Sequence, residues 1–558
     1  MNDVYLSEKE LIEWMNQWSN RKVTRGKSIK EILSYNGISL WGFYQVPIYS
    51  VLKMIPTKKI RSSTNIILIY LMNRFCKSFL IIKTIIRFVL GKLILKEENY
   101  LKKNQRKIMI IGSNWIDTAD PMLESPKQDL IFGSLIKACK KNYNIIALDQ
   151  DIVVESMRLL DLRKLFEKAK YNRGIWKTIE SFTTFEVLYK VFKYSRKIER
   201  MWKELLCDPN FINSLNPNGI NIFCILKPTF NHLAKYITVS SILYLELMKK
   251  AISIEGPDLI IISDEYDTIG KAATLAGKLN GVPTLAIQHG TIYPLHPGYI
   301  HFPSEVSKQV SINHSLIPDK TAVYGSYTKE ILNNHCNYPN DAVEITGQPR
   351  YDILARVKEI FDKEEFLKRY GLDTDKKIVL LITQNRRVSE KFLRTAVKAL
   401  KQLIDVQTII KPHPNENKKW LMEVLKEEDY KAVILNPKAN TYEALYACDL
   451  MITVYSTVAI EAMCLRKPVI IVNLLGMPDP LPYVDIGAAL GVYEEGDVNQ
   501  AITDALFKTE IKEKLIEGME KFVNYHLFDI GNATNNIINL INNLLYVQRK
   551  SSNGKVSR

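Results

Sequence analysis

The chain of 558 residues carries a net charge of +16, with 46% hydrophobic and 24% charged residues. It is too long for one ordinary core, so two or three domains are expected, and its composition is ordinary for a soluble globular protein. The seven cysteines are scattered and never form a Cys-x-x-Cys pair, which argues against a disulfide framework and a zinc site and favours a reducing cytoplasm; no secretory signal is recognised.

The positive charge is concentrated at the start of the chain. Residues 1–107 hold 20 Lys and Arg against 7 Asp and Glu, which leaves only +3 for the rest. This imbalance suggests an anionic partner, either lipid headgroups or nucleic acid. No nucleic-acid motif accompanies the charge, so no nucleic acid is expected.

Residues 64–95 are strongly apolar, but five basic residues interrupt them, namely Arg74, Lys77, Lys83, Arg87 and Lys92. No uncharged run reaches the roughly 18 residues that a membrane-spanning helix needs. We therefore expect residues 1–106 to be a basic, mainly helical region, in which a helix lies on an anionic membrane surface with snorkelling basic side chains. A pair of core helices with solvated lysines is the alternative.

From residue 107 onward, short apolar runs alternate with helical patterns, which is typical of βαβ units around a parallel sheet. In the first half we expect strands at residues 107–115, 144–154, 258–267 and 282–290. Residues 268–281 predict a helix that ends at a glycine in the left-handed conformation. Residues 155–255 predict a mostly helical insertion, to which we assign no role.

The second half repeats the pattern. We expect strands at residues 376–385, 406–414, 431–436, 449–456 and 468–473, with helices at 389–404, 440–448 and 457–467, and a long helical tail from about 498 to 545. The predicted fold is α/β, with two Rossmann-like doubly wound domains facing each other across a cleft. The first domain would cover residues 107–365 and the second residues 366–545, followed by a polar tail at 546–558. Ligands of such sheets bind at the carboxyl ends of the strands.

Two motifs of the second half lie at such ends. Lys411 and His413 directly follow an apolar strand, where their positive charge suits a phosphate or pyrophosphate; a proline-bounded turn is the alternative. Ser456 or Thr457 can cap the next helix, whose first free N–H groups favour an anion. Glu461 lies one turn on and can accept hydrogen bonds from ribose hydroxyls. Together they predict a pocket for a nucleotide mono- or diphosphate.

In the first half, three of the eight histidines fall between residues 286 and 301. Their spacing is not that of a compact zinc motif. His289 ends a strand beside the expected cleft, where it can act as a general base or phosphate ligand, or simply bind loop carbonyls. Gln288, Gly290 and His296 are expected to line the cleft on the acceptor side. His301 is expected to be structural or to face the acceptor.

Residues 263–267 end another strand with acidic side chains. Asp264 or Glu265 is a candidate base for removing the acceptor hydroxyl proton; an acidic loop that caps a helix is the alternative. Arg350 is a further candidate for contacting the donor phosphate. Residues 149–151 (Asp-Gln-Asp) resemble a metal-binding DxD motif, but their surroundings do not support one. We expect no metal and no cofactor, because positive side chains and a helix N-terminus can stabilise a leaving phosphate.

The motifs SDEYD, AIQHG, TGQPRYD, KPHP and STVAIEAMCLRKPV, spread over residues 255–475, resemble GT-B glycosyltransferases of the surface and capsular polysaccharide group. This group includes Kdo-transferase-like, polysialyltransferase-like and CDP-glycerol-transferase-like enzymes. The resemblance implies that His413, Ser456 and Thr457 contact the donor's phosphate and that Glu461 faces the ribose. It also implies a QHG turn in the cleft and an acidic pair near the acceptor.

We therefore expect a cytoplasmic glycosyltransferase, peripheral on the cytoplasmic face of the membrane. It would move a sugar from a CMP- or UDP-linked nucleotide sugar to a lipid-linked or polysaccharide acceptor, that is, a glycan or glycolipid. The alternatives are a nucleotide-sugar 2-epimerase, a polyol-phosphate transferase of the CDP-glycerol type, and a non-catalytic scaffold of a polysaccharide assembly complex.

Overall fold

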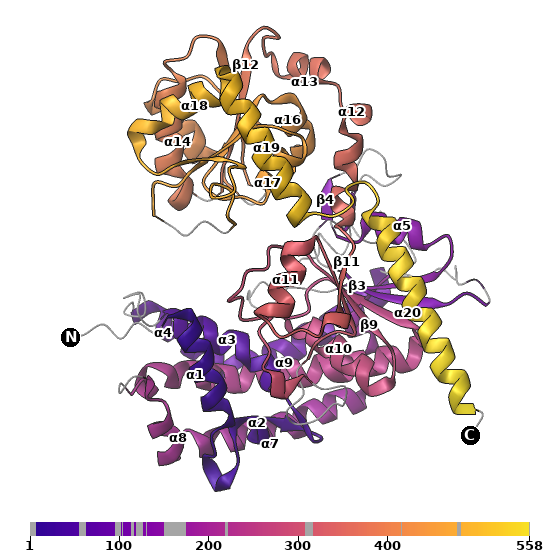
Figure 1. Cartoon of the computed structure of the whole chain (residues 1–558). Helices are drawn as coiled ribbons and strands as arrows, with labels where there is room; N and C mark the ends of the chain where they lie inside the picture. Colours follow the sequence, from indigo (N-terminus) through magenta and orange to yellow (C-terminus); the bar gives the residue numbers. More distant parts are fainter. Residues whose placement is uncertain are drawn as a thin grey trace.

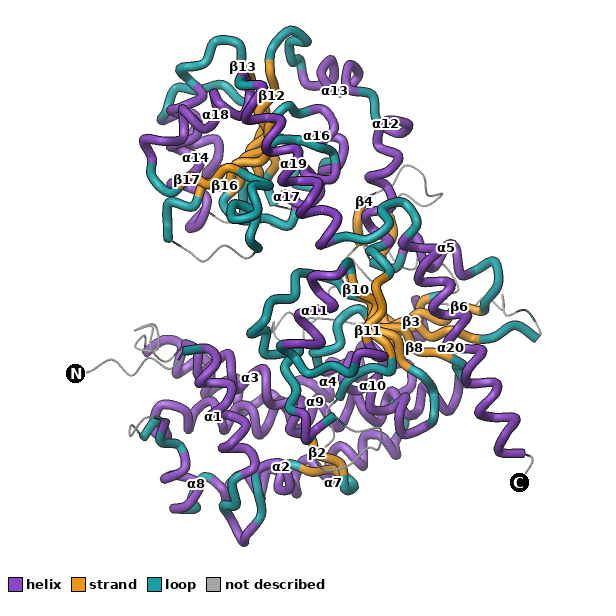
Figure 2. The backbone as a smooth tube through the Cα atoms, in the orientation of Figure 1, coloured by secondary structure: helices purple, strands orange, loops and turns teal. Residues whose placement is uncertain are grey.

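The computed structural model describes residues 7–54, 63–94, 102, 104–112, 116–118, 127–129, 131–149, 175–217, 221–306, 316–384, 386–413, 416–476 and 481–556. Two separate parallel sheets organise them, and both appear as distinct bundles of strands in Figure 2. The expected pair of doubly wound domains is therefore confirmed. Figure 1 shows the C-terminal domain above the N-terminal one, with the first helices at the lower left.

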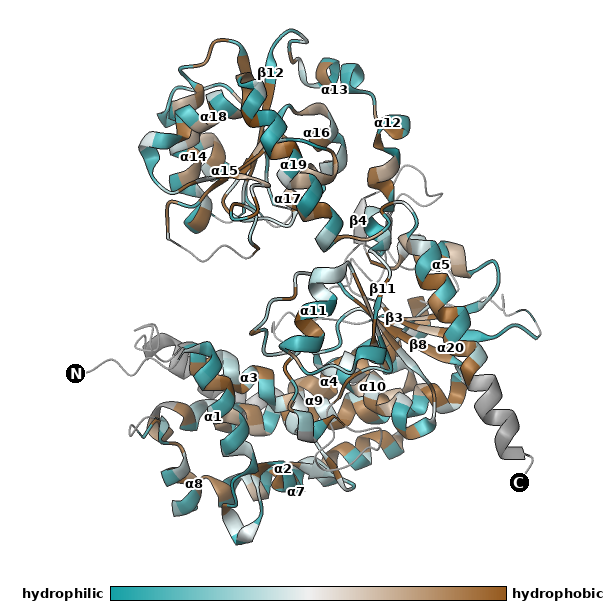
Figure 3. Ribbon diagram, in the orientation of Figure 1, coloured by the Kyte–Doolittle hydropathy of each residue, from teal (hydrophilic) through white to brown (hydrophobic). Residues whose placement is uncertain are grey.

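The N-terminal sheet has seven parallel strands in the order β11-β10-β9-β8-β3-β6-β7. Their bounds are β3 Lys107–Gly112, β6 Asn144–Asp149, β7 Trp176–Thr178, β8 Leu259–Ile262, β9 Thr284–Ile287, β10 Lys320–Val323 and β11 Val343–Ile345. Short runs of buried Ile, Leu and Val make these strands, because helices cover both faces of a parallel sheet. The strands are correspondingly hydrophobic in Figure 3. Sequence reasoning missed β7, β10 and β11.

The C-terminal sheet has six parallel strands in the order β14-β13-β12-β15-β16-β17. Their bounds are β12 Lys377–Ile382, β13 Val406–Lys411, β14 Val433–Ile434, β15 Leu450–Thr453, β16 Val469–Val472 and β17 Leu490–Val492. The first five correspond to predicted strands, and β17 was missed. Two small antiparallel pairs, β1 Ser34–Tyr35 with β2 Ile38–Ser39 and β4 Ile116–Thr118 with β5 Lys127–Asp129, complete the described strands.

The helices of the N-terminal half are α1 Glu8–Asn20, α2 Ile29–Ile32, α3 Trp41–Met54, α4 Ser63–Ile94, α5 Gly133–Cys139, α7 Phe185–Leu205, α8 Pro209–Ser214, α9 Phe223–Glu255, α10 Thr268–Asn280 and α11 Ser326–Asn334. Those of the C-terminal half are α12 Val357–Ile360, α13 Lys363–Tyr370, α14 Arg386–Leu400, α15 Lys419–Glu427, α16 Thr441–Ala447, α17 Val458–Cys464, α18 Val498–Phe507, α19 Thr509–His526 and α20 Ala533–Val556. As predicted, α10 ends at Gly281, whose φ of 66° is left-handed.

The described helices among the first hundred residues pack on the N-terminal domain and share its core. Buried residues of α1, α2 and α3 belong to the same hydrophobic cluster as β3, α7 and α9. The predicted snorkelling of basic side chains is wrong for two residues of α4, since Lys83 and Arg87 are each only 2% exposed. Arg87 instead forms ion pairs with Asp149 (2.7 Å) and Glu180 (3.0 Å). The side chains of Arg74 and Lys77 lie outside the described part of the chain.

The helical tail consists of three helices and does not stay with the C-terminal domain. Although we expected it to end that domain at residue 545, α20 continues to Val556 and packs under the N-terminal sheet, where Ile537 and Ile541 are fully buried. Asp352 fixes its start by accepting hydrogen bonds from the N–H groups of Gly531, Ala533 and Thr534. The chain therefore crosses between the domains twice, at neighbouring points.

Within the described ranges, no helix combines the length and the apolar character needed to cross a membrane.

Candidate active site

Polar residues at the carboxyl ends of the two sheets meet between the domains. The interdomain pocket, of about 470 Å³, is lined mainly by residues after β8, β9 and β10 and by facing residues of the C-terminal domain. The C-terminal pocket, of about 490 Å³, lies at the ends of β12, β13 and β15. Thr457 lines both pockets, so a ligand placed at Thr457 can reach from one into the other.

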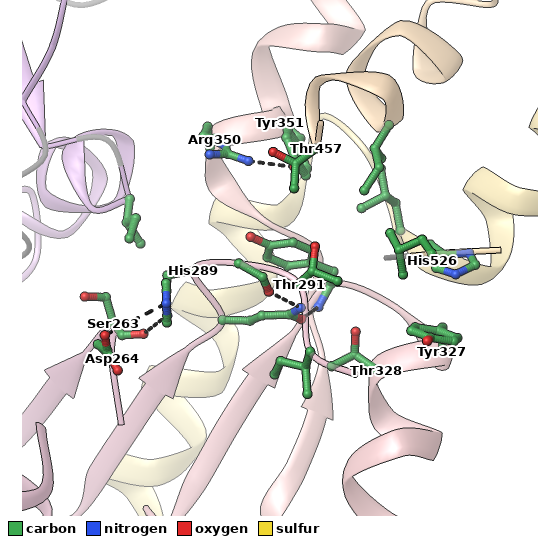
Figure 4. Close-up of a pocket in the computed structure, with 18 of the residues that line it drawn as sticks. Ser263, Asp264, His289, Thr291, Tyr327, Thr328, Arg350, Tyr351, Thr457 and His526 are labelled. Carbon is green, nitrogen blue, oxygen red and sulfur yellow. Dashed lines mark hydrogen bonds and ion pairs between the residues drawn. The ribbon is translucent and has the colours of Figure 1, made fainter. Parts of the chain in front are cut away.

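His289 follows β9 and faces the interdomain pocket (Figure 4). Its Nδ1 lies 2.8 Å from the carbonyl oxygen of Ser263. Because a carbonyl only accepts hydrogen bonds, Nδ1 carries the hydrogen of the neutral ring. Nε2 then has a free lone pair, and it lies 3.9 Å from Oδ2 of Asp264. The ring is oriented as a proton acceptor beside a carboxylate, which is an arrangement for general-base chemistry.

The three acidic residues of 263–267 have three different positions. Asp264 lines the interdomain pocket, and burial raises its pKa, against the attraction of His289 and hydrogen bonds from the N–H groups of Tyr266 and Asp267. Asp267 caps α10 through the N–H of Gly270, so the capping interpretation holds for this residue.

Glu265 is a correction to the sequence-based candidates. Successive residues point to opposite sides, so while Asp264 faces the pocket, Glu265 enters the core at 4% exposure. Its carboxylate accepts hydrogen bonds from Tyr338 and, at 3.0 Å, from Thr321. Burial raises the pKa of Glu265 to about 7. This carboxyl group is part of the packing of the domain and lies away from the cleft.

The rest of the histidine-rich segment supports the turn that carries His289. Gln288 is 3% exposed; its side chain bonds the carbonyl of Gly290 and accepts from the N–H of Tyr324, and both Gln288 and Gly290 line the pocket. His296 packs against Tyr266 instead, with ring centroids 4.9 Å apart, and burial lowers its pKa to about 4. His301 is buried beside Tyr338, which makes it structural.

Arg350 faces His289 from the opposite side of the pocket, on the segment that crosses into the C-terminal domain (Figure 4). Its guanidinium donates to the hydroxyl of Tyr351 at 2.6 Å and lies 3.6 Å from the carboxylate of Glu461. Glu461, on α17, is 5% exposed. This contact joins a cation of the interdomain pocket to the residue expected to face the ribose.

Lys411 and His413 line the C-terminal pocket but differ in exposure. Lys411 is 4% exposed, and its ammonium group donates to the carbonyls of Pro412 and Pro437 at 3.0 and 2.8 Å, so it stiffens the loop as well as supplying charge. His413 is exposed in the pocket. Its partial burial and the nearby Lys411 lower the pKa of His413. His413 is therefore the more accessible of the two for a ligand.

Ser456 and Thr457 stand at the start of α17. The Ser456 hydroxyl accepts a hydrogen bond from the N–H of Val458, the first residue of α17, at 3.2 Å. Thr457 is the N-cap residue, its side chain makes no capping bond, and it is exposed between the two pockets. Because α17 has only seven residues, its dipole adds little, and the two hydroxyls are the groups that matter for a ligand.

Several lining residues escaped sequence reasoning. Tyr327, Thr328 and His526 come from α11 and from the end of α19, and Gln384 and Glu416 complete the C-terminal pocket. Only Gln384 carried a recognisable signal, because it is a polar residue at the end of the predicted strand 376–385. His526 stacks on Tyr327 at 4.4 Å across the crossing point of the chain, which no local pattern indicates.

The DxD-like segment is engaged elsewhere. Asp149 is buried in its ion pair with Arg87, while Gln150 and Asp151 lie outside the described residues. Among the described side chains, no group of three His, Cys, Asp or Glu residues is arranged to hold a metal ion.

The fold is of the GT-B kind, with two parallel-sheet domains that meet at a cleft, which is lined here by a histidine, an arginine and hydroxyl groups. The sequence family described as CDP-glycerol:poly(glycerophosphate) glycerophosphotransferase matches residues 193–474, half of the chain. The chain belongs to this family, which is one of the groups that its motifs resemble. No curated protein matches the sequence.

The solved structures that are similar to this chain include two epimerases and a glycosyltransferase. UDP-N-acetylglucosamine 2-epimerase from Rickettsia bellii is 14% identical over 80% of this chain and 98% of its own, with a TM-score of 0.45. UDP-GlcNAc 2-epimerase from Neisseria meningitidis, bound to UDP-GlcNAc, is 14% identical over 78% of this chain and 99% of its own, with a TM-score of 0.44. A glycosyltransferase from Rickettsia africae is 12% identical over 79% of this chain and 99% of its own, with a TM-score of 0.45.

Proposed function

We propose that the protein transfers a polyol phosphate from a CDP-linked donor to a hydroxyl group of a lipid-linked or growing surface polymer. The observation that carries the proposal is His289, whose tautomer leaves Nε2 unprotonated in the interdomain pocket, 3.9 Å from Asp264 and across from Arg350. The family favours polyol phosphate over the sugar that the motifs alone suggested, and so favours what was an alternative.

The acceptor side of the reaction uses His289 and Asp264. An acceptor hydroxyl in the interdomain pocket gives its proton to Nε2 of His289, and its oxygen attacks the polyol-bearing phosphorus of the donor. The Ser263 carbonyl keeps the ring in the required tautomer. Asp264 stabilises the positive charge that the imidazole ring acquires, since its carboxylate lies beside Nε2.

The donor side uses the residues around Thr457. The new O–P bond forms while the phosphoanhydride bond breaks, so CMP leaves with the negative charge of the bridging oxygen. Arg350, His413 and the hydroxyls of Ser456 and Thr457 line the two pockets where this charge develops. Glu461 lines neither pocket and is buried against Arg350, so we assign it the orientation of that arginine in place of the ribose contact that the motifs suggested. We propose that transfer needs no metal ion, so EDTA leaves the rate unchanged.

The identity of the nucleotide can be tested by thermal stabilisation. CMP, CDP, UDP and GDP are compared on the wild type, His413→Ala and His335→Ala, an exposed histidine that lines neither pocket. At about 100 times its dissociation constant a nucleotide adds roughly 2.7 kcal/mol to the folded state. We expect CMP and CDP to stabilise the wild type and His335→Ala, and His413→Ala to lose most of the shift. A scaffold without a donor site would show no shift with any nucleotide.

The fate of the phosphate separates the enzymatic alternatives. With a donor labelled at the polyol phosphate, the proposed reaction releases CMP and leaves the label in the polymer as a phosphodiester. A glycosyltransferase would transfer a sugar without that phosphorus, and a 2-epimerase would turn over without any acceptor. Label that never enters the acceptor would overturn the proposal.

We place the reaction on the cytoplasmic face of the membrane. The described cysteines, Cys139, Cys207, Cys224, Cys336, Cys448 and Cys464, are all free, which suits a reducing compartment. Fractionation of the native host cell, with the protein followed in the membrane pellet before and after a high-salt wash, checks this placement.

A further inference from the structure

In the part of α4 whose side chains are described, residues 78–94, two cations face the protein. These are Lys83 and Arg87, and Arg87 is paired there with Asp149 and Glu180. The outer face of this part carries large aliphatic groups at helical spacing, with Lys92 as its exposed cation; the aliphatic residues are Ile82, Ile85, Val89 and Leu93, with exposed fractions of 52%, 45%, 46% and 66%. Water is a poor partner for such a face.

The helix α7 adds aromatic groups to this surface. Its inner face is already complete, because Val187, Val191, Ile198 and Trp202 are buried. Phe185, Tyr189 and Phe192 form a second apolar stripe on the outside, with exposed fractions of 86%, 54% and 45%. Further along the exposed face, the stripe gives way to cations: Lys193, Arg196, Lys197, Arg200 and Lys203.

The two stripes belong to one layer of the fold. Both α4 and α7 pack on α9, and Gly91 of α4 packs so closely on Thr178 and Ser181 that a Cβ would not fit. Thr178 and Ser181 immediately precede α7 in the chain. Figure 1 shows α7 and α9 in the helical layer below the N-terminal sheet. We call the seven apolar residues of the two stripes, together with the five cations of α7, the apolar-basic face.

We propose that the apolar-basic face docks on the surface of an anionic lipid bilayer. Aliphatic and aromatic side chains enter the boundary between headgroups and acyl chains, and the neighbouring cations attract anionic headgroups. The net charge of the first 107 residues has the same sign and adds to the attraction. Inward pairing of Arg87 favours docking, since it removes one charge from the outer side of α4, and the exposed Lys92 can extend its ammonium group to the headgroups. The inference rests on the proposed function only for the lipid-linked acceptor, which docking would bring to the protein.

Vesicle flotation tests the inference with the full chain. Vesicles of phosphatidylcholine with 30% phosphatidylglycerol, by design about one lipid in three anionic, are compared with phosphatidylcholine alone. The variants are Val89→Glu/Leu93→Glu on α4 and Phe185→Ser/Tyr189→Ser on α7. Ile404→Glu is the matched control, because Ile404 is 84% exposed on the other domain.

We expect the wild type and Ile404→Glu to float with the anionic vesicles. Each double variant should lose at least about tenfold in partition coefficient, and neutral vesicles should bind the wild type weakly. Thermal stabilisation by CMP stays unchanged in every variant, which shows that the fold and the donor site are intact. A loss of vesicle binding with retained nucleotide binding therefore reports on the face alone, and a failure of the proposed donor leaves the flotation result unaffected.

Two outcomes would overturn the inference. One is flotation of both double variants at the wild-type level. The other is a wild type that dimerises without lipid and becomes monomeric in Val89→Glu/Leu93→Glu, as seen by light scattering, because the face would then bind a second copy of the chain.

Discussion

The interdomain pocket and the C-terminal pocket share Thr457, yet they hold their functional groups in different ways. On the interdomain side, burial raises the pKa of Asp264, and a hydrogen bond to the backbone carbonyl of Ser263 selects the tautomer of the neutral His289 ring. On the C-terminal side, His413 and Thr457 are exposed and Ser456 is partly so. Under the proposed function, this difference assigns proton transfer to the N-terminal domain and phosphate binding, through accessible groups, to the C-terminal domain.

Replacing His289 with alanine should give the largest effect, and it distinguishes the contribution of the interdomain pocket from that of the C-terminal pocket. We expect kcat to fall by about a thousandfold, since a positioned base contributes about 10²–10⁴. The KM for the donor and the stabilisation by CMP should stay as in the wild type, because the C-terminal pocket is untouched. Steady-state kinetics beside His335→Ala, the exposed control, make the comparison. A kcat within tenfold of wild type would assign the proton to another group.

Asp264→Asn should cost less, about a hundredfold in kcat. The amide keeps an oxygen for the N–H groups of Tyr266 and Asp267 but loses the charge that stabilises the protonated imidazole ring. Because the pKa of Asp264 is raised, the carboxylate is lost as pH falls, and the wild-type rate should fall on the acid side. The variant should lack that contribution to the pH profile of kcat. Identical profiles for the two proteins would remove Asp264 from the reaction.

Ser456→Ala tests the C-terminal pocket, which Ser456 lines. We expect the KM for the donor to rise about tenfold, the equivalent of one hydrogen bond to a charged group, with a smaller change in kcat. Ser50→Ala, on the exposed face of α3, is the control. A fall in kcat as large as that of His289→Ala, with KM unchanged, would contradict the division of labour between the pockets.

Glu265→Gln should leave activity nearly unchanged and alter stability instead. The folded-state pKa is raised from 4.5 to about 7, so the stabilisation is present below pH 4.5 and is lost as pH rises through 7. The free energy of unfolding of the wild type should therefore fall by up to about 3 kcal/mol relative to the variant across that window. Urea unfolding at pH 4.5 and pH 8 measures it. Parallel curves for the two proteins would show that the carboxyl group does not titrate there.

The residues at strand ends could be predicted because an apolar run followed by a polar group is a local signal. It located Asp264, His289, Lys411 and Ser456 on the correct edges of the sheets. It could not tell Asp264 from Glu265, since which of two neighbours enters the core depends on Tyr338 and Thr321, far along the chain.

The orientation of α4 could not be predicted from the sequence, because it too depends on residues that are distant in the chain. Basic residues within an apolar helix are usually read as snorkelling, and the partners that draw Arg87 inward are 62 and 93 positions away, at Asp149 and Glu180. His526 likewise reaches the pocket only through the return of the chain at the end of α19. Such contacts follow from tertiary packing, which the local pattern of one sequence does not reveal.

The return of α20 to the N-terminal sheet also bears on the order in which the chain can fold during synthesis. Domains usually fold from the N-terminus as they leave the ribosome. Here the C-terminal domain is continuous in the chain, whereas the first domain lacks the buried side chains of Ile537 and Ile541 until α20, which follows the whole C-terminal domain, has been synthesised. The domain that is made first is finished last, and a premature stop codon just before α20 would damage the half of the protein that was translated long before it.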